Sequence, residues 1–206
     1  MRKWLLMICL APVAAWAEDV PVAAAVEPVA RNPVGLVRAG AVEDAIVERV
    51  KSWAESQLAI PVPLAESMET KAESLNAVAD EAAARVGPDD LGLIVLFQSE
   101  APVPNHGIFR PEQRVVVVNV GLMREGADEE KFGRRMERQV IRGIGTLMGL
   151  ELSPIPESAM GMYSTMEELD QMGRNLDPPW LYRLQQRARE LGLPLDPDNP
   201  FNMLRE

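Results

Sequence analysis

Apolar residues recur at helical spacing in several stretches of the chain. Between residues 41 and 58 they fall near one helical face and the charged residues on the other, which is typical of an amphipathic helix. The same spacing returns from Asp128, a residue suited to a helix N-cap, to Gly149, which can end a helix in a left-handed conformation. We predict further helices over residues 65–86, near 166–173 and over 179–191.

Three apolar segments between these helices have the length and flanks of β-strands. Residues 91–98 are a short apolar run bounded by turn signals, as expected of a buried strand. Residues 106–110, 111–113 and 114–122 predict a strand, a tight turn and a second strand, which is rich in valine and therefore suits a sheet. A sheet is thus expected before the helix at 128–149.

The first 17 residues have the pattern of a secretory signal peptide. Arg2 and Lys3 precede an apolar run, which ends in Ala15-Trp16-Ala17, a small-x-small cleavage pattern. We predict cleavage after Ala17 and a periplasmic or secreted protein. The alternative is an uncleaved membrane anchor, which the shortness of the run disfavours. Residues 18–40 are rich in proline, alanine and valine without a clean period, and predict a linker before a domain at 41–206.

Charge and cysteine content narrow the possible partners. The chain has 21 basic and 31 acidic residues, and loss of Arg2 and Lys3 with the signal peptide would change the net charge from −10 to −12. A protein with this net charge repels nucleic acid, so we expect no nucleic-acid partner. We also expect no stable membrane span once the signal peptide is cleaved. Cleavage would also remove Cys9, the only cysteine, which excludes disulfides and cysteine-ligated metal in the exported protein.

Residues 142–152, RGIGTLMGLEL, have the spacing of a zinc-peptidase helix without its ligands. In H-E-x-x-H, two histidines one turn apart bind zinc and the glutamate activates a zinc-bound water; a glycine then turns the chain toward a third histidine. With the order strand, hairpin, helix, glycine turn, methionine-containing stretch and final helix, the chain resembles the archaemetzincins over about residues 91–193. This metzincin family has the motif HExxHxxGxxHC-x4-CxM and a later CPxC-like pair. The resemblance implies an α+β, zincin-like single domain, in which a small mixed sheet packs against the active-site-type helix and a C-terminal helical subdomain follows.

The resemblance places unsuitable residues at every ligand position. Arg142 and Thr146 stand at the first two histidines, Gly143 at the general-base glutamate and Leu152 at the third histidine. The turn glycine and the Met-turn methionine are present, as Gly149 and Met160. The family's four later cysteines, implied to hold a structural metal, correspond to Ser153, Ser158, Asp177 and Trp180. We therefore expect a domain without a metal or another cofactor.

The joint loss of these ligands favours one functional hypothesis. A protein that no longer uses a metal has no reason to keep any of its ligands, so we expect an exported, catalytically inactive archaemetzincin-like pseudoprotease that binds a peptide or protein. Three alternatives stay open: an active peptidase or other hydrolase with an unrecognised site, a structural envelope protein, and an unrelated α/β domain whose helix glycines serve close packing on a sheet.

Four residues of the helix at 128–149 form a candidate anion- or peptide-binding stripe. Arg135, Arg138, Arg142 and Thr146 follow spacings of three, four and four residues, so they share one helical face. Guanidinium groups bind carboxylates bidentately, which suits a peptide C-terminus. The alternative is a solvated face whose arginines pair with nearby acids.

The remaining candidates for catalysis are weak. His106 is the only histidine and cannot build a zinc site alone; its loop position predicts a solvent-exposed or turn-stabilising role. Ser153, Ser158 and Ser164 have no credible base nearby, and the chain contains no G-x-S-x-G elbow, so we do not expect a serine hydrolase.

Overall fold

The molecule is built around a four-stranded sheet with the strand order β1-β2-β4-β3. The computed structural model describes residues 31–204, so the predicted signal peptide, residues 1–17, lies outside the described residues. Strands β1 (Gly35–Gly40), β2 (Leu93–Gln98) and β4 (Val115–Asn119) are parallel. Strand β3 (Gly107–Arg110) pairs with β4 in the antiparallel direction and forms one edge of the sheet. The mixed sheet and its helices confirm the predicted α+β fold.

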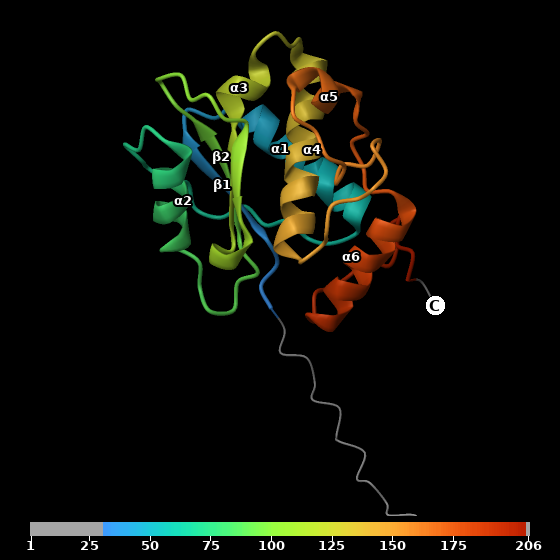
Figure 1. The fold of residues 1–206 in the computed structure, drawn as a ribbon. Helices are drawn as coiled ribbons and strands as arrows, with labels where there is room; N and C mark the ends of the chain where they lie inside the picture. Colours follow the sequence, from blue (N-terminus) through green and yellow to red (C-terminus); the bar gives the residue numbers. More distant parts are fainter. Residues whose placement is uncertain (1–30, 205–206) are drawn as a thin grey trace, which may run out of the picture.

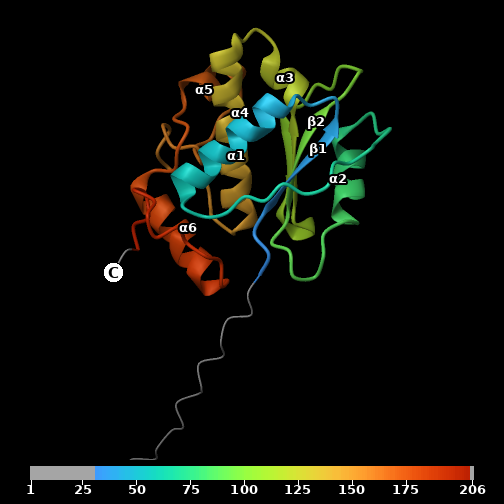
Figure 2. The ribbon, with the colours of Figure 1, turned by 180° about the vertical axis from the view of Figure 1, so that it is seen from behind.

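Helices cover both faces of the sheet (Figure 1). Helix α2 (Leu75–Ala83) packs on one face, and helices α1 (Asp44–Leu58) and α4 (Glu129–Leu147) pack on the other. Seen from behind, α1 lies across α4 (Figure 2). The short helix α3 (Val120–Arg124) follows β4. Helices α5 (Met166–Gln171) and α6 (Pro178–Glu190) lie on the side of α4 away from the sheet and form the C-terminal helical part (Figure 1).

The central strands β2 and β4 are buried on both faces because helices cover each side. In β4, Val116 and Val118 belong to the core beneath α1 and α4, whereas Val115 and Val117 belong to the core beneath α2. All four side chains are 0% exposed. This double burial explains why the sequence of the sheet shows continuous apolar runs rather than an alternating pattern.

Local chemistry fixes both ends of α4, as the sequence predicts. The Asp128 carboxylate accepts a hydrogen bond from the Lys131 backbone N–H (2.7 Å), which is the contact expected of an N-cap. After the helix, Gly149 has φ +82°, a conformation in which a side chain would be strained. No helix among residues 31–204 is both long and apolar enough to cross a bilayer.

The end of the predicted linker is part of the sheet. Residues 18–30 lie outside the described residues, but Gly35–Gly40 forms β1, which is in register with β2 from Gly35↔Leu93 to Gly40↔Gln98. The linker prediction is therefore wrong for these six residues. A strand buried against a neighbour needs no period of its own, because the pairing with β2 selects its conformation.

The helix predicted over residues 65–86 begins much later than expected. The Ala65 N–H donates to the Leu36 carbonyl (2.9 Å) and the Met68 N–H to the Arg38 carbonyl (2.7 Å), so residues 63–68, here called the edge segment, run beside β1. Helix α2 starts only after Ser74, whose hydroxyl accepts a hydrogen bond from the Ala77 N–H (3.2 Å). The outer side of β1 is therefore covered, whereas β3 is flanked by β4 alone within the sheet.

The strand predicted over residues 114–122 is shorter than expected. The Asn119 side chain accepts a hydrogen bond from the Leu122 N–H (3.2 Å), and this N-cap starts α3 at Val120. The sequence did not indicate where the strand ends, because the valines favour a strand and Val120 itself is β-branched.

Candidate functional site

Two glycines determine how α4 lies against its neighbours. A Cβ atom on Gly143 would be 2.9 Å from Ile94 Cδ1 and 3.3 Å from Val116 Cγ1, so this side of the helix lies very close to the sheet. A Cβ atom on Gly145 would be 2.8 Å from Met160 Sδ, so that side faces residues 151–163, here called the methionine loop. Because an α-helix has about 3.6 residues per turn, positions 142 and 146 fall between these two sides. They lie where the sheet and the methionine loop approach each other.

Arg142 connects the methionine loop with the edge strand β3. Its Nη1 atom donates to the carbonyl oxygens of Ala159 (3.5 Å) and Gly161. Its guanidinium carbon lies 5.3 Å from the ring centroid of Tyr163 and 5.9 Å from that of Phe109, a residue of β3. Burial lowers the pKa of the guanidinium, and Tyr163 opposes this effect. No carboxylate among residues 31–204 forms an ion pair with Arg142.

Tyr163 links Arg142 to the only histidine of the chain. Its hydroxyl accepts a hydrogen bond from Gln139 Nε2 (3.0 Å), and burial raises the pKa of the phenol. The His106 ring is stacked on the Tyr163 ring, with 5.8 Å between centroids and 15° between planes. The pKa of His106 is lowered, first by burial and second by the charge of Arg135. His106 is partly buried and stacked on Tyr163, so of the two roles that its loop position predicts, solvent-exposed or turn-stabilising, the first is wrong.

Arg135 and Arg138, the first two arginines of the stripe, are buried and form neither a solvated face nor an open site. The Arg135 side chain is 4% exposed; it binds both carboxylate oxygens of Asp170 (2.7 and 2.8 Å) and the carbonyl of Met123 (2.9 Å). Arg138, a residue 2% exposed, donates to the carbonyls of residues 172 and 173, and burial lowers its pKa to about 10. Only Arg142 and Thr146 of the stripe are partly exposed. The Thr146 hydroxyl has no hydrogen-bond partner within residues 31–204.

The structure brings together some of the positions that correspond to the family's later cysteines. The Ser153 hydroxyl donates to Asp177 Oδ1 (3.0 Å), and the indole N–H of Trp180 donates to the carbonyl of Glu151 (2.8 Å). Ser158 is 2% exposed and its hydroxyl accepts a hydrogen bond from the Met160 N–H (3.3 Å). Hydrogen bonds and the packing of Trp180 thus connect the two segments that carry these positions.

Leu152 lies on the methionine loop but offers no ligand atom. The next residue, Ser153, donates its N–H to the Met160 carbonyl (3.0 Å), and the Leu152 side chain is 46% exposed. Zinc in proteins is held by histidine nitrogen, cysteine sulfur or carboxylate oxygen, so Arg142, Thr146 and Leu152 do not fit a zinc site. Within residues 31–204 no three His, Cys, Asp or Glu side chains gather closely enough to hold a metal ion.

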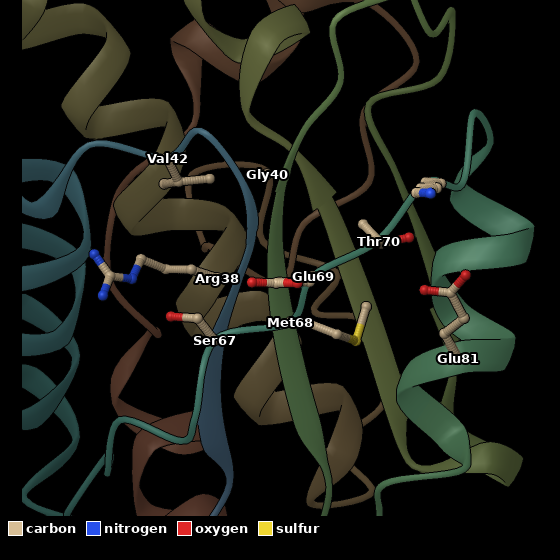
Figure 3. A pocket seen from close by; sticks show the side chains of 9 residues that line it. Arg38, Gly40, Val42, Ser67, Met68, Glu69, Thr70 and Glu81 are labelled. Atoms are coloured by element: carbon tan, nitrogen blue, oxygen red, sulfur yellow. The ribbon is translucent and has the colours of Figure 1, made fainter.

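A separate hollow of about 770 Å³ lies at the carboxyl end of β1 (Figure 3). Its walls include Arg38 of β1, Glu81 of α2 and residues 67–71 of the chain that leaves the edge segment. Arg38 is already paired with Asp44. None of the residues that the sequence singles out lines this hollow, so we place the candidate site at Arg142.

The arrangement of β3, α4, the glycine turn and the methionine loop belongs to an archaemetzincin-like fold, which solved structures share. Among solved structures, the chain is similar to the archaemetzincin of Methanopyrus kandleri, with 19% identity, a TM-score of 0.62, and coverage of 76% of this chain and 96% of that chain. A zinc-dependent peptidase of Methanocorpusculum labreanum gives 15% identity and a TM-score of 0.58, with coverage of 74% and 100%. The archaemetzincin of Archaeoglobus fulgidus, solved in complex with malonate, gives 14% and 0.52, with coverage of 76% and 98%.

These similarities confirm the archaemetzincin-like fold that the residue spacing predicts. No protein-family profile and no curated protein sequence matches the chain. At such low identity the likeness establishes the fold alone, and the functional argument has to come from the residues of the site.

Three residues complete the site although the sequence did not indicate them: Phe109, Gln139 and Tyr163. Gln139 stands three residues before Arg142, on the same helical stripe, so its spacing was an available signal. Tyr163 follows Met160 in the methionine-containing stretch, and Phe109 lies in the predicted hairpin, but only the folded chain shows that both rings lie near the same guanidinium.

Proposed function

We propose that this protein is an exported, catalytically inactive archaemetzincin-like protein that binds an extended segment of a peptide or protein along strand β3. The position of Arg142 carries the proposal. By the spacing of the motif, Arg142 corresponds to the family's first zinc ligand, and carbonyl oxygens of the methionine loop accept its hydrogen bonds. A side chain that is itself cationic cannot bind Zn²⁺ and would repel the ion from neighbouring ligands.

The position of the general base supports the loss of catalysis. Gly143 has no carboxylate, and a side chain there would meet Ile94 and Val116, both of which are 0% exposed. His106 could serve as a base only if its ring were free to reach a substrate, and it is stacked on Tyr163. The site therefore lacks a group in position to activate water by the route that the archaemetzincin motif uses.

The edge of the sheet supports a binding role. An edge strand presents unpaired backbone N–H and carbonyl groups, with which an extended chain can pair. The residues of β3 are partly exposed, and the methionine loop carries exposed apolar residues: Leu152 (46%), Ile155 (39%) and Met162 (77%). Backbone pairing on β3 combined with apolar contacts on the loop would hold a polypeptide across Arg142.

The signal-peptide pattern in residues 1–17 supports the proposed export. Expression of the full chain in a bacterial host, followed by fractionation and mass determination of the exported form, tests this part. We expect a periplasmic or secreted product that begins at Glu18. A full-length product that stays with the membrane would contradict the predicted cleavage.

The exported form then tests catalysis and binding. We expect substoichiometric zinc and no peptidase activity that EDTA abolishes; one zinc per chain with chelator-sensitive hydrolysis would overturn the proposal. To test binding, a photo-crosslinking residue at Ile108 of β3 is compared with one at Glu66 of the edge segment. The edge segment lies beside β1, at the opposite edge of the sheet from β3. Specific cross-links to polypeptide are expected at position 108 and not at position 66.

A further inference from the structure

The guanidinium of Arg142 is a partly buried charge without a counter-ion among residues 31–204. Two neighbouring arginines of α4 are paired: Arg134 with Glu130 (2.8 Å) and Arg135 with Asp170 (2.7 Å). Arg138 has no carboxylate partner in the described part of the chain, but it is enclosed by protein, with only 2% of the residue exposed. Arg142 differs because it is partly exposed and its hydrogen bonds go to neutral carbonyl oxygens through Nη1. A partly desolvated cation of this kind is most stable when an anion forms an ion pair with it.

The unused donors suit a carboxylate. Nε and Nη2 of Arg142 donate to no atom of residues 31–204, and together they form the fork that binds both oxygens of a carboxylate. Thr146 lies one helical turn further along the same face and has a hydroxyl without a partner in the same range. The rings of Phe109 and Tyr163 flank the guanidinium, which limits the access of water and strengthens a charge pair there.

The neighbourhood of this fork indicates where the carboxylate comes from. Phe109 belongs to β3, so a chain paired with β3 passes close to Arg142. The backbone of such a chain offers neutral carbonyls along its interior and a carboxylate only at its last residue. On the other side, Gly161 accepts the hydrogen bond from Arg142, and the adjacent Met162 is 77% exposed, a surface suited to an apolar side chain.

We infer that Arg142 and Thr146 recognise the free C-terminal carboxylate of a polypeptide whose last, apolar residues lie against strand β3. This inference rests on the proposed peptide-binding function and makes it specific for chain ends.

The test compares two forms of one probe. A neutral BODIPY dye, which carries no carboxylate after coupling, is attached to the N-terminus of the pentapeptide Val-Ala-Val-Ala-Leu. The peptide is made with a free C-terminal carboxylate or with a C-terminal amide. Fluorescence anisotropy with the exported protein, in a low-salt buffer that contains no carboxylate, gives the Kd of each form. We expect the carboxylate form to bind at least about tenfold more tightly, as suits a bidentate charged contact, and added salt to reduce the difference.

Four variants assign the effect to the site. Arg142→Gln should weaken the carboxylate peptide to the Kd of the amide peptide, and Arg142→Lys should keep part of the preference because the charge remains. Arg134→Gln is the matched control on the exposed part of the same helix and should leave both Kd values unchanged. Thr146→Val, which removes no intramolecular hydrogen bond of the side chain, should weaken the carboxylate peptide several-fold and covers the case in which Arg142→Gln fails to fold.

The outcomes separate this inference from the proposed function. Equal Kd values for the carboxylate and amide peptides would overturn the recognition of chain ends and leave peptide binding intact. Displacement of the peptide by acetate at concentrations near the Kd of the peptide would also overturn it, because the site would then serve a small anion. Absence of binding for both peptides, together with absence of cross-links at position 108, would contradict both proposals.

Discussion

Asp170 is the carboxylate that ties α5 to α4, and its replacement gives a quantitative test of the structure. Its oxygens accept hydrogen bonds from Arg135 Nε (2.7 Å) and Nη2 (2.8 Å), and Lys131 Nζ lies 2.9 Å away. The Arg135 side chain is 4% exposed and that of Asp170 is 18% exposed. The change Asp170→Asn therefore leaves a buried guanidinium whose remaining partners are the carbonyls of Met123 and Glu125.

The magnitude follows from the pKa of Asp170. The hydrogen bond from Arg135 is the main cause that lowers this pKa from 3.8 to about 2. A difference of this size corresponds to about 2 to 3 kcal/mol of unfolding free energy at neutral pH. Because the folded-state pKa is the lower one, this stability is present above about pH 5 and is lost as the pH falls toward 2. Asp170→Asn should lower the free energy of unfolding by about 2 to 3 kcal/mol at pH 7, and the deficit should shrink below pH 5.

Urea denaturation followed by circular dichroism at pH 7 and at several lower pH values measures the effect. Asp80→Asn is the matched control: Asp80 Oδ1 lies 2.6 Å from Arg110 Nη1, but its side chain is 66% exposed, so the expected loss is below about 1 kcal/mol. A loss for Asp170→Asn no larger than that of the control, or a deficit that does not change between pH 7 and 3, would refute the argument from burial.

Three further predictions concern other parts of the molecule. An NMR titration of the His106 ring should give a pKa below 6.5. The free energy of unfolding should fall as the pH drops from 6.5 toward that pKa, because the unfolded chain binds the proton more tightly. A pKa above 6.5 would contradict the burial of the ring. Gly40→Ala should cost at least about 2 kcal/mol in urea denaturation, because Gly40 has φ +80° and the added Cβ would lie 2.1 Å from the Gln98 carbonyl oxygen, whereas Gly126→Ala, with φ +62° and open space, should cost about 1 kcal/mol. EDTA should leave the thermal midpoint of the exported protein unchanged, and a fall on chelation would show a bound metal that supports the fold.

The parts of the fold that the sequence predicted are those whose signals are local. Helix α4 carries its own N-cap at Asp128, its apolar period and its terminal glycine, so its limits could be placed without knowledge of its neighbours. Strand β1 carries no such signals, since pairing with β2 and the edge segment determines its conformation. The late start of α2 has the same cause, because backbone bonds to β1 hold the preceding residues extended.

In the candidate site, too, the sequence indicated positions through local spacing but not the contacts between distant segments. The spacing of the family motif predicts that Arg142 and Thr146 correspond to ligand positions, and this stays a prediction. The two residues lie between the sheet and the methionine loop. The partner of Arg135 could not be predicted, because Asp170 lies 35 residues away and no pattern connects the two. The backbone carbonyls that accept hydrogen bonds from Arg138 could not be predicted from the sequence either, since every residue has a carbonyl.

The tight seat of Gly143 on Ile94 and Val116 has an evolutionary consequence. If the chain descends from an active peptidase, as we propose, histidines at positions 142, 146 and 152 would not enter the core, whereas a glutamate at 143 would have to displace core side chains or shift the helix outward. Under the proposed ancestry, the abandonment of hydrolysis is hard to reverse, because the close approach of helix and sheet now occupies the space that the carboxylate needs for its return.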